Sequence, residues 1–179
     1  MIYDISQELF SGCVYPGDRA PEYKRVLSHE SGDGVNLTEV YMNAHNATHI
    51  DAPIHMVEGG KTVDQISLDA CVGICEVISY NDRARIQETD AERILLSECE
   101  SIDMDTAELL VKKGVRFLGV EGQSVGTREV HVTLLKTDMV ILEGARLGHV
   151  PEGKYRLCAC PIKLGESDGA PCRAIVEDL

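Results

Sequence analysis

The residues best suited to chemistry lie in one short segment, His45-Asn-Ala-Thr-His49-Ile-Asp51-Ala-Pro53-Ile-His55. Three of the six histidines of the chain and one aspartate fall within it. Imidazole and carboxylate groups are ligands that Zn²⁺, Mn²⁺ and Fe²⁺ share, and the segment has no thiol that would suggest a closed structural zinc site. Pro53 prevents a helix from continuing and fixes the loop, so the side chains can converge. The spacing favours a divalent-metal site over histidines that cluster by chance.

A second pair of candidate ligands lies far downstream, at His131 and Glu143. Glu143 ends the apolar run Met-Val-Ile-Leu-Glu, where an unpartnered carboxylate would be costly to bury. Either a metal ion or a salt bridge could supply the partner. From position alone the two interpretations are equally good. The candidate salt-bridge partners are Arg116, Arg128 and Arg146.

Other patterns carry less chemistry. The run Gly59-Gly-Lys-Thr62 lacks the earlier glycine of a phosphate-binding loop, because His55 occupies that position. His29 and His149 are isolated in the sequence. No nucleophile elbow or Cys–His signature is present, which gives serine or cysteine nucleophiles little support.

The seven cysteines indicate a reducing compartment. Their number is odd and the opening residues lack the basic and apolar segments of a secretory signal, so a disulfide framework is not expected. We expect reduced, mostly buried thiols in a cytoplasmic protein. The cysteines are at positions 13, 71, 75, 99, 158, 160 and 172.

Composition limits the possible partners. The chain has 179 residues and a formal charge of −13, with 44% apolar and 26% charged residues, which is typical of one globular domain. No apolar stretch is long enough to span a membrane. The acidic balance argues against binding to nucleic acid or to an anionic membrane, and a small-molecule substrate is expected instead.

The chemistry-bearing residues must be positioned by alternating strands and helices. Strands are predicted at residues 1–6, 35–44, 72–80, 115–120, 139–143 and 155–164, the second of them half-buried. A helix is predicted to begin at Asp105, with Glu108 completing a capping box and Gly114 ending it. A short helix carries His131. Interleaved strands and helices predict a single domain of α/β (α+β) class over residues 1–179.

At these residues the chain resembles the cyclase-like metal-dependent hydrolases, a family that includes bacterial kynurenine formamidases. Its signature H-x-G-T-H-x-D-x-P-x-H matches from His45 to His55, with Ala47 in place of the usual glycine. Further landmarks follow the family order along nearly the whole chain: an opening Asp-Ile-Ser, the Tyr-Pro-Gly-Asp turn, and the segments 119–124, 131–135 and 141–144. The resemblance implies a swivelling β/β/α fold and a homodimer or a dimer of dimers.

The resemblance also implies roles for single residues. His45, His49 and Asp51 would hold a first metal, and Asp51 would bridge to a second metal held by His131 and Glu143. His55 would transfer protons, and Tyr15, in place of the family's common tryptophan, would contact the substrate.

The implied activity is hydrolysis of a small amide by metal-activated water, as in an arylformamidase of tryptophan catabolism, with Zn²⁺ or Mn²⁺ as cofactor. A cyclase, dehydratase or lactonase would use the same metal with different pocket walls. A non-catalytic metal-binding relative would need the ligands but not His55.

Overall fold

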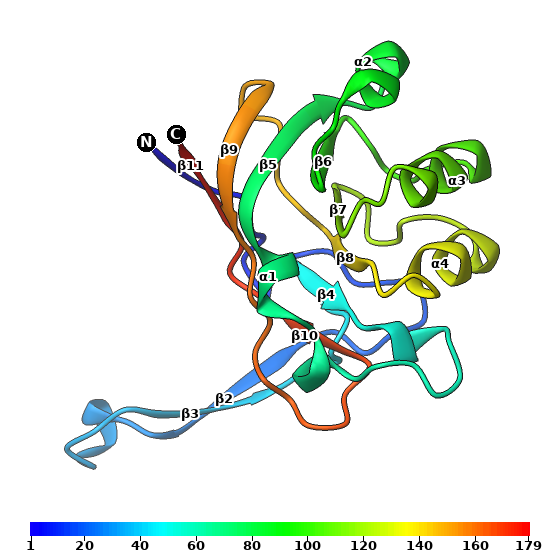
Figure 1. The fold of residues 1–179 in the computed structure, drawn as a ribbon. Helices are drawn as coiled ribbons and strands as arrows, with labels where there is room; N and C mark the ends of the chain where they lie inside the picture. Colours follow the sequence, from blue (N-terminus) through cyan, green and yellow to red (C-terminus); the bar gives the residue numbers. More distant parts are fainter.

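A nine-stranded mixed sheet forms the body of the computed structural model, which describes residues 1–179 (Figure 1). The strand order is β1-β11-β9-β5-β6-β7-β8-β4-β10. Strands β5 to β8 are parallel neighbours, and the remaining pairs are antiparallel. The strands span Ile2–Asp4 (β1), His49–Asp51 (β4), Val72–Ser79 (β5), Arg93–Ser97 (β6), Phe117–Val120 (β7), Val140–Glu143 (β8), Gly153–Cys158 (β9), Gly169–Pro171 (β10) and Ile175–Asp178 (β11).

Three helices line up on one side of the parallel strands, whereas α1 (Leu68–Cys71) leads directly into β5 (Figure 1). They are α2 (Arg83–Glu88), α3 (Met104–Lys112) and α4 (Arg128–Leu135). The Asp103 side chain caps α3 by accepting the Thr106 N–H at 2.8 Å, so the predicted start at Asp105 was two residues late. Gly114, at φ +73°, follows the helix as predicted.

Alternation along the strands divides the core between the two faces of the sheet. Ile94, Leu96 and Leu118 join the helix side chains in one buried cluster. Leu95 and Phe117 belong to a second cluster on the opposite face. The predicted α/β class is therefore confirmed, as a single domain with a curled, half-barrel sheet.

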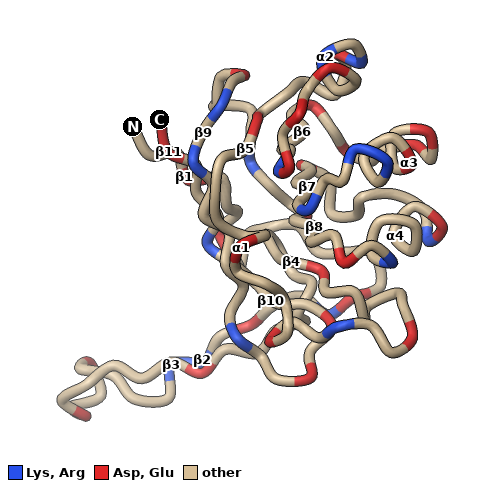
Figure 2. The backbone as a smooth tube through the Cα atoms, in the orientation of Figure 1, with Lys and Arg blue, Asp and Glu red and all other residues tan.

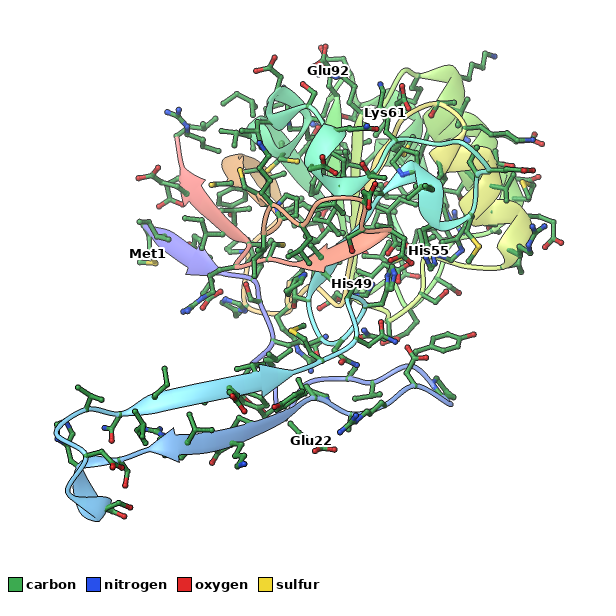
Figure 3. All side chains as sticks on the ribbon, turned by 90° about the horizontal axis from the view of Figure 1, so that it is seen from below. Met1, Glu22, His49, His55, Lys61 and Glu92 are labelled. Carbon is green, nitrogen blue, oxygen red and sulfur yellow. The ribbon has the colours of Figure 1, made fainter.

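The segment predicted as a half-buried strand at residues 35–44 lies outside this sheet. Strand β3 (Leu37–Tyr41) pairs only with β2 (Glu22–Leu27), and every residue of β3 is exposed. Figure 1 shows this hairpin extending away from the body, and in Figure 3 it lies apart from the rest of the chain with Glu22 on its outer strand. The prediction of a strand was correct, but that of partial burial was wrong, because alternating apolar residues do not reveal whether a sheet face has a partner.

Sequence patterns located five strands of the nine-stranded sheet and missed the other four. The strands predicted at residues 1–6, 72–80, 115–120, 139–143 and 155–164 correspond to β1, β5, β7, β8 and β9 with shifted ends. The pattern did not identify β4, β6, β10 or β11. Acidic and basic residues are spread over most elements (Figure 2), and no helix is long and apolar enough to cross a membrane.

Candidate metal centre

Two neighbouring strands place three of the predicted ligands together. In the β4–β8 ladder, His49 lies directly opposite Glu143. Residues two apart on a strand share a face, so Asp51 points to the same side as His49. Ile50 points the other way into the core and is fully buried. The signature segment was expected as a loop; its central part is instead a strand, and the strand's two-residue period aligns His49 with Asp51.

Helix α4 adds a second imidazole to this cluster, that of His131. The His131 Nε2 atom lies 3.1 Å from Glu143 Oε1 and 3.7 Å from Asp51 Oδ2. On the far side of this ring, Nδ1 donates to the Thr127 carbonyl at 3.0 Å. His49 has the same arrangement, with Nδ1 donating to the Ala47 carbonyl at 2.9 Å. A backbone carbonyl on one ring nitrogen fixes the tautomer and leaves the other nitrogen free, as in histidines that bind metals.

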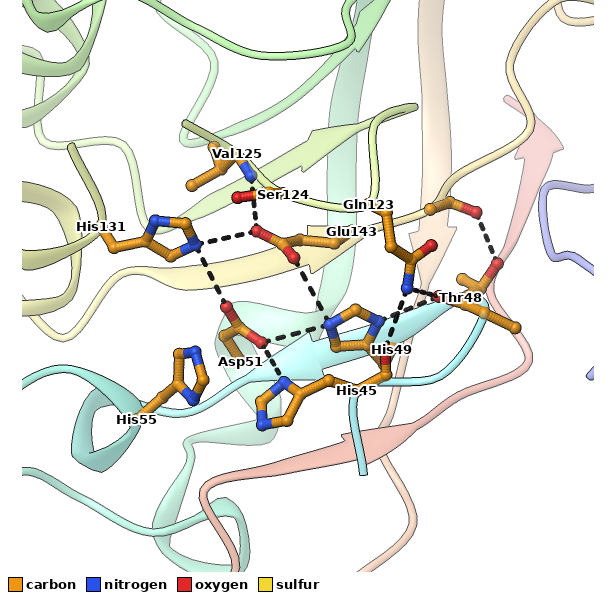
Figure 4. A network of polar contacts seen from close by, with 12 residues as sticks. His45, Thr48, His49, Asp51, His55, Gln123, Ser124, Val125, His131 and Glu143 are labelled. Carbon is orange, nitrogen blue, oxygen red and sulfur yellow. Dashed lines mark hydrogen bonds and ion pairs between the residues drawn. The ribbon is translucent and has the colours of Figure 1, made fainter. Parts of the chain in front are cut away.

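The centre of this cluster lacks polar partners. His49 Nε2 and Asp51 Oδ2 are buried without a hydrogen bond, a costly state unless an ion or ligand completes them. His49 Nε2 lies 3.4 Å from both Asp51 Oδ1 and Glu143 Oε2, which is long for a hydrogen bond. Figure 4 shows the side chains facing a common centre. Two buried carboxylates with converging imidazoles fit a divalent cation.

Potential ligand atoms form two overlapping groups here, each with its atoms within 4.8 Å of one another. One contains His45, His49 and Asp51, and the other contains Asp51, His131 and Glu143. Asp51 belongs to both, which is the position required of a bridging carboxylate.

The pKa values of the clustered side chains show the same concentration of charge. Burial by itself lowers the pKa of His49, but contacts with the carboxylates of Asp51 and Glu143 outweigh burial and raise the pKa to about 10. Burial would raise the pKa of Asp51, yet its contacts with His45 and His49 hold that pKa far below the usual range. The pKa of His131 is also raised, because contact with Glu143 outweighs burial. The raised pKa values of these two imidazoles are those of a site that stabilises positive charge.

Glu143 does not pair with an arginine. Its Oε1 atom accepts the Val125 N–H at 2.6 Å and faces His131, while Oε2 faces His49. Arg116 contacts Glu92 instead, at 3.5 Å, and neither Arg128 nor Arg146 forms an ion pair. The salt-bridge alternative for Glu143 is therefore wrong, since its neighbours are the other candidate ligands.

His45 and His55 meet a residue that the sequence did not single out, Asp168. Its Oδ2 atom lies 3.0 Å from His45 Nε2 and 3.2 Å from His55 Nδ1, and these three side chains form another potential ligand group. The two imidazole rings are 4.2 Å apart between centroids. Asp168 lies more than a hundred residues after the signature segment, so no local spacing could have identified it.

Gly169 makes room for this arrangement. A Cβ atom there would lie 2.5 Å from His45 Cε1, far inside van der Waals contact, so any side chain would displace the imidazole. A glycine directly after an aspartate is the one sequence signal that could have marked this place.

A buried network holds the turn that carries His45. Thr48 Oγ1 donates to the Gly144 carbonyl at 2.6 Å and accepts the Gln7 N–H at 2.8 Å. Gln123 Nε2 donates to the carbonyls of His45 and Ala47, at 2.9 and 3.1 Å. The threonine of the signature thus fixes the backbone that positions the ligands.

Ala47 adopts a backbone conformation that usually favours glycine. Its φ is +54° and its side chain is buried. A left-handed conformation costs a residue with a Cβ about 1–2 kcal/mol. The departure from the family glycine therefore introduces local strain, while the Ala47 carbonyl still accepts from His49.

The cluster opens into a cavity of about 490 Å³. His45, His55, His131 and Glu143 lie in its wall, and so does Tyr15. Most of the remaining lining residues are of polar types, and they are Asp18, Asn43, Met56, Gln123, Ser124, Gly126, Arg128 and Asp168.

A half-barrel α/β sheet with a buried His/Asp/Glu cluster at its edge defines a candidate metalloprotein. Residues 3–102 match the family described as "Putative cyclase". A kynurenine formamidase from Erythrobacter litoralis is 34% identical over 99% of this chain and 94% of its own length. The chain therefore belongs to this cyclase family, and the predicted resemblance is confirmed.

Solved structures agree with this assignment. One described as a predicted metal-dependent hydrolase from Bacillus stearothermophilus has a TM-score of 0.83 at 28% identity, covering 98% of this chain and 97% of that one. Isatin hydrolase A from Labrenzia aggregata has a TM-score of 0.82 at 18% identity, covering 98% and 93%. The second likeness establishes the shared fold alone.

Proposed function

We propose that the protein is a metal-dependent amidohydrolase that cleaves a small amide, in the manner of an arylformamidase. The observation that carries this proposal is the convergence of His49, Asp51, His131 and Glu143 on a centre without polar partners, beside His55 in an open cavity. Relatives named kynurenine formamidase, 31–34% identical over nearly the full chain, support the amide class.

The ligands would divide between two ions. His45, His49 and Asp51 would hold the first, while Asp51, His131 and Glu143 would hold the second. When bound, a divalent ion such as Zn²⁺ or Mn²⁺ lowers the pKa of water and polarises a substrate carbonyl. The donor set, without thiolates, is open to either metal.

We assign proton transfer to His55. Its Nδ1 atom contacts Asp168, and its ring lies in the cavity wall beside His45. It belongs to neither of the two ligand groups centred on Asp51. A histidine placed in this way can take a proton from the attacking water and return it to the leaving amine. A site that only binds metal has no need of such an imidazole, so His55 favours an enzyme over a non-catalytic relative.

The cavity is lined mainly by residues with polar groups, which suits a substrate that carries polar ends. Only Tyr15 and Met56 are apolar among its lining residues. Arg128 lies in the wall one helical turn before His131 and forms no ion pair, and Asp18 lies in the same wall. N-formylkynurenine combines an aromatic formamide with a charged amino-acid end, and we propose that Arg128 meets its carboxylate.

The test is hydrolysis by metal-free and reloaded protein. Protein stripped by a chelator and then loaded with Zn²⁺ or Mn²⁺ would be given N-formylkynurenine, formanilide, isatin and a simple lactone. We expect cleavage of the formamides only after loading, with a lower KM for N-formylkynurenine than for formanilide. Full activity in metal-free protein would refute the metal mechanism, and preference for the lactone would favour the lactonase alternative.

We also propose that the protein assembles as a homodimer, or a dimer of such dimers, through the β2–β3 hairpin. A two-stranded hairpin is marginally stable on its own in water, yet Tyr23, Leu27, Leu37, Val40 and Tyr41 are all exposed on it. The two strands carry Lys24 and Arg25 against Glu22 and Glu39, so their formal charges cancel. Two copies of a chain with charge −13 can therefore meet there without repulsion between these strands.

Sedimentation of a hairpin variant would test this assembly. Val40 lies opposite Tyr23 in the hairpin, so Val40→Asp should yield monomers from a wild-type dimer. Leu68→Asp, a matched change at an exposed apolar residue of α1, should remain dimeric. A monomeric wild-type chain at micromolar concentration would contradict the proposal.

A further inference from the structure

Asp168 contacts two histidines to which the proposed function gives different tasks. One carboxylate oxygen, Oδ2, lies 3.0 Å from Nε2 of His45 and 3.2 Å from Nδ1 of His55. An ionised carboxylate can only accept hydrogen bonds. Both ring nitrogens that face Asp168 must therefore carry a proton and donate it.

These two hydrogen bonds determine which nitrogen of each ring is left free. With one proton of His45 held on Nε2 by Asp168, the Nδ1 atom points toward the centre, where it lies 2.8 Å from Asp51 Oδ1. Without a metal ion Nδ1 donates to that carboxylate, and a bound cation would replace this second proton and take the Nδ1 lone pair. With the proton of His55 held on Nδ1, its Nε2 atom can accept a proton. The hydrogen bond at one ring nitrogen decides the state of the other.

The position of Asp168 is fixed by backbone contacts with the signature segment. Its carbonyl accepts the Ala52 N–H at 2.9 Å. The next residue, Gly169, lies opposite Asp51 in the β4–β10 ladder. The missing Cβ of Gly169 lets His45 lie against this strand. The chain thus brings the carboxylate to the outer side of both imidazoles, away from the buried ligand cluster.

We propose that Asp168 is a positioning residue that sets the tautomers of a metal ligand, His45, and of the proton-transfer residue, His55. The assignment for His55 rests on the proposed hydrolytic function, whereas that for His45 depends only on metal binding. One carboxylate would thereby couple metal affinity to proton transfer. Removing a residue that hydrogen-bonds to the outer nitrogen of a metal-binding histidine lowers metal affinity or activity by about 10- to 100-fold.

The test is Asp168→Asn, which keeps the shape of the side chain but exchanges one acceptor oxygen for a donor. An amide oxygen at the position of Oδ2 can still face both imidazoles, but as a neutral acceptor it holds their N–H groups more weakly than the carboxylate, and the flipped amide would turn NH₂ toward them. The readouts are the Zn²⁺ dissociation constant, the ¹⁵N shifts of the histidine rings in metal-free and Zn²⁺-loaded protein, and kcat on a formamide. Glu166→Gln removes the same charge from an exposed side chain two residues away and is the matched control.

We expect Asp168→Asn to weaken Zn²⁺ binding and to lower kcat, each by about 10- to 100-fold, with ring shifts that show a changed tautomer of His45 or His55. Asp168→Glu should restore part of both losses. Glu166→Gln should resemble the wild type. Metal affinity and ring shifts need no substrate, so they test the role of Asp168 even if no formamide is cleaved.

Two results would overturn the proposal. One is unchanged Zn²⁺ affinity and unchanged ring shifts in Asp168→Asn, whatever happens to kcat, because Asp168 would then act on the substrate or not at all. The other is an equal loss in Glu166→Gln, which would show that the effect comes only from net charge near the cavity.

Discussion

Replacing Glu143 with glutamine distinguishes a metal ligand from a residue that only balances charge. The side chain is almost fully buried and faces three groups: the Val125 N–H at 2.6 Å, His131 at 3.1 Å and His49 at 3.4 Å. Glutamine keeps this shape, and its oxygen can still accept from Val125. What it removes is the negative charge between two imidazoles.

The size of the effect in the metal-free protein follows from these contacts. Unit charges at 3.1–3.4 Å attract by about 5 kcal/mol at an effective dielectric constant of about 20. Desolvation of the buried groups offsets much of this attraction, and breaking a buried pair costs about 3–5 kcal/mol. Because glutamine keeps one hydrogen bond, we expect the lower end, about 3 kcal/mol. For a chain of this length that lowers Tm by about 6–12 °C.

The assay is metal content after loading, measured beside thermal unfolding of the metal-free protein. Glutamine is a poor metal ligand, so we expect Glu143→Gln to fall from two metal ions per chain toward one. Glu121→Gln is the matched control, since Glu121 also accepts backbone N–H groups, from Leu147 at 2.9 Å and Glu98 at 2.7 Å, away from the cluster. Two tightly bound metal ions in Glu143→Gln, with only Tm reduced, would refute the assignment of Glu143 as a ligand.

Three further predictions follow from the same geometry. His55→Ala should lower kcat by about 10²–10⁴-fold while metal content, measured on the same sample, stays near wild type; loss of stoichiometric metal would make His55 a ligand instead. Gly169→Ala should displace the imidazole of His45 and weaken Zn²⁺ binding. The control is Gly165→Ala, where an added Cβ meets nothing within 4 Å and the affinity should not change. Equal Zn²⁺ affinity in both variants would show that the site tolerates the clash. Metal loading at pH 7 should release protons, because the raised pKa of His49 keeps that ring protonated in the metal-free chain. Affinity should therefore rise with pH, and titration calorimetry in buffers of different ionisation enthalpy would detect the release, while a heat independent of the buffer would contradict it.

The sequence by itself was sufficient to predict the α/β class and to select the residues that form the buried cluster. Local spacing carried this information, because His45, His49, Asp51 and His55 share one segment and their side chains have metal-binding chemistry. The apolar run before Glu143 likewise showed that this carboxylate needs a partner. Backbone hydrogen bonds and hydrophobic alternation act over a few residues, so they leave a local trace in the sequence.

Only the tertiary structure decided which distant groups meet. The pairing of β4 with β8 puts His49 opposite Glu143, and pairing of β4 with β10 brings Asp168 to His45 and His55. These ladders join segments about a hundred residues apart, and β4 and β10, with three residues each, are too short to show a period. The wrong prediction of burial for the β2–β3 hairpin has the same explanation. Its apolar residues alternate as in a half-buried strand, but burial depends on which other segments pack against the hairpin. The identity of contact partners is a property of the folded chain, and local patterns determine only which side chains are available for contact.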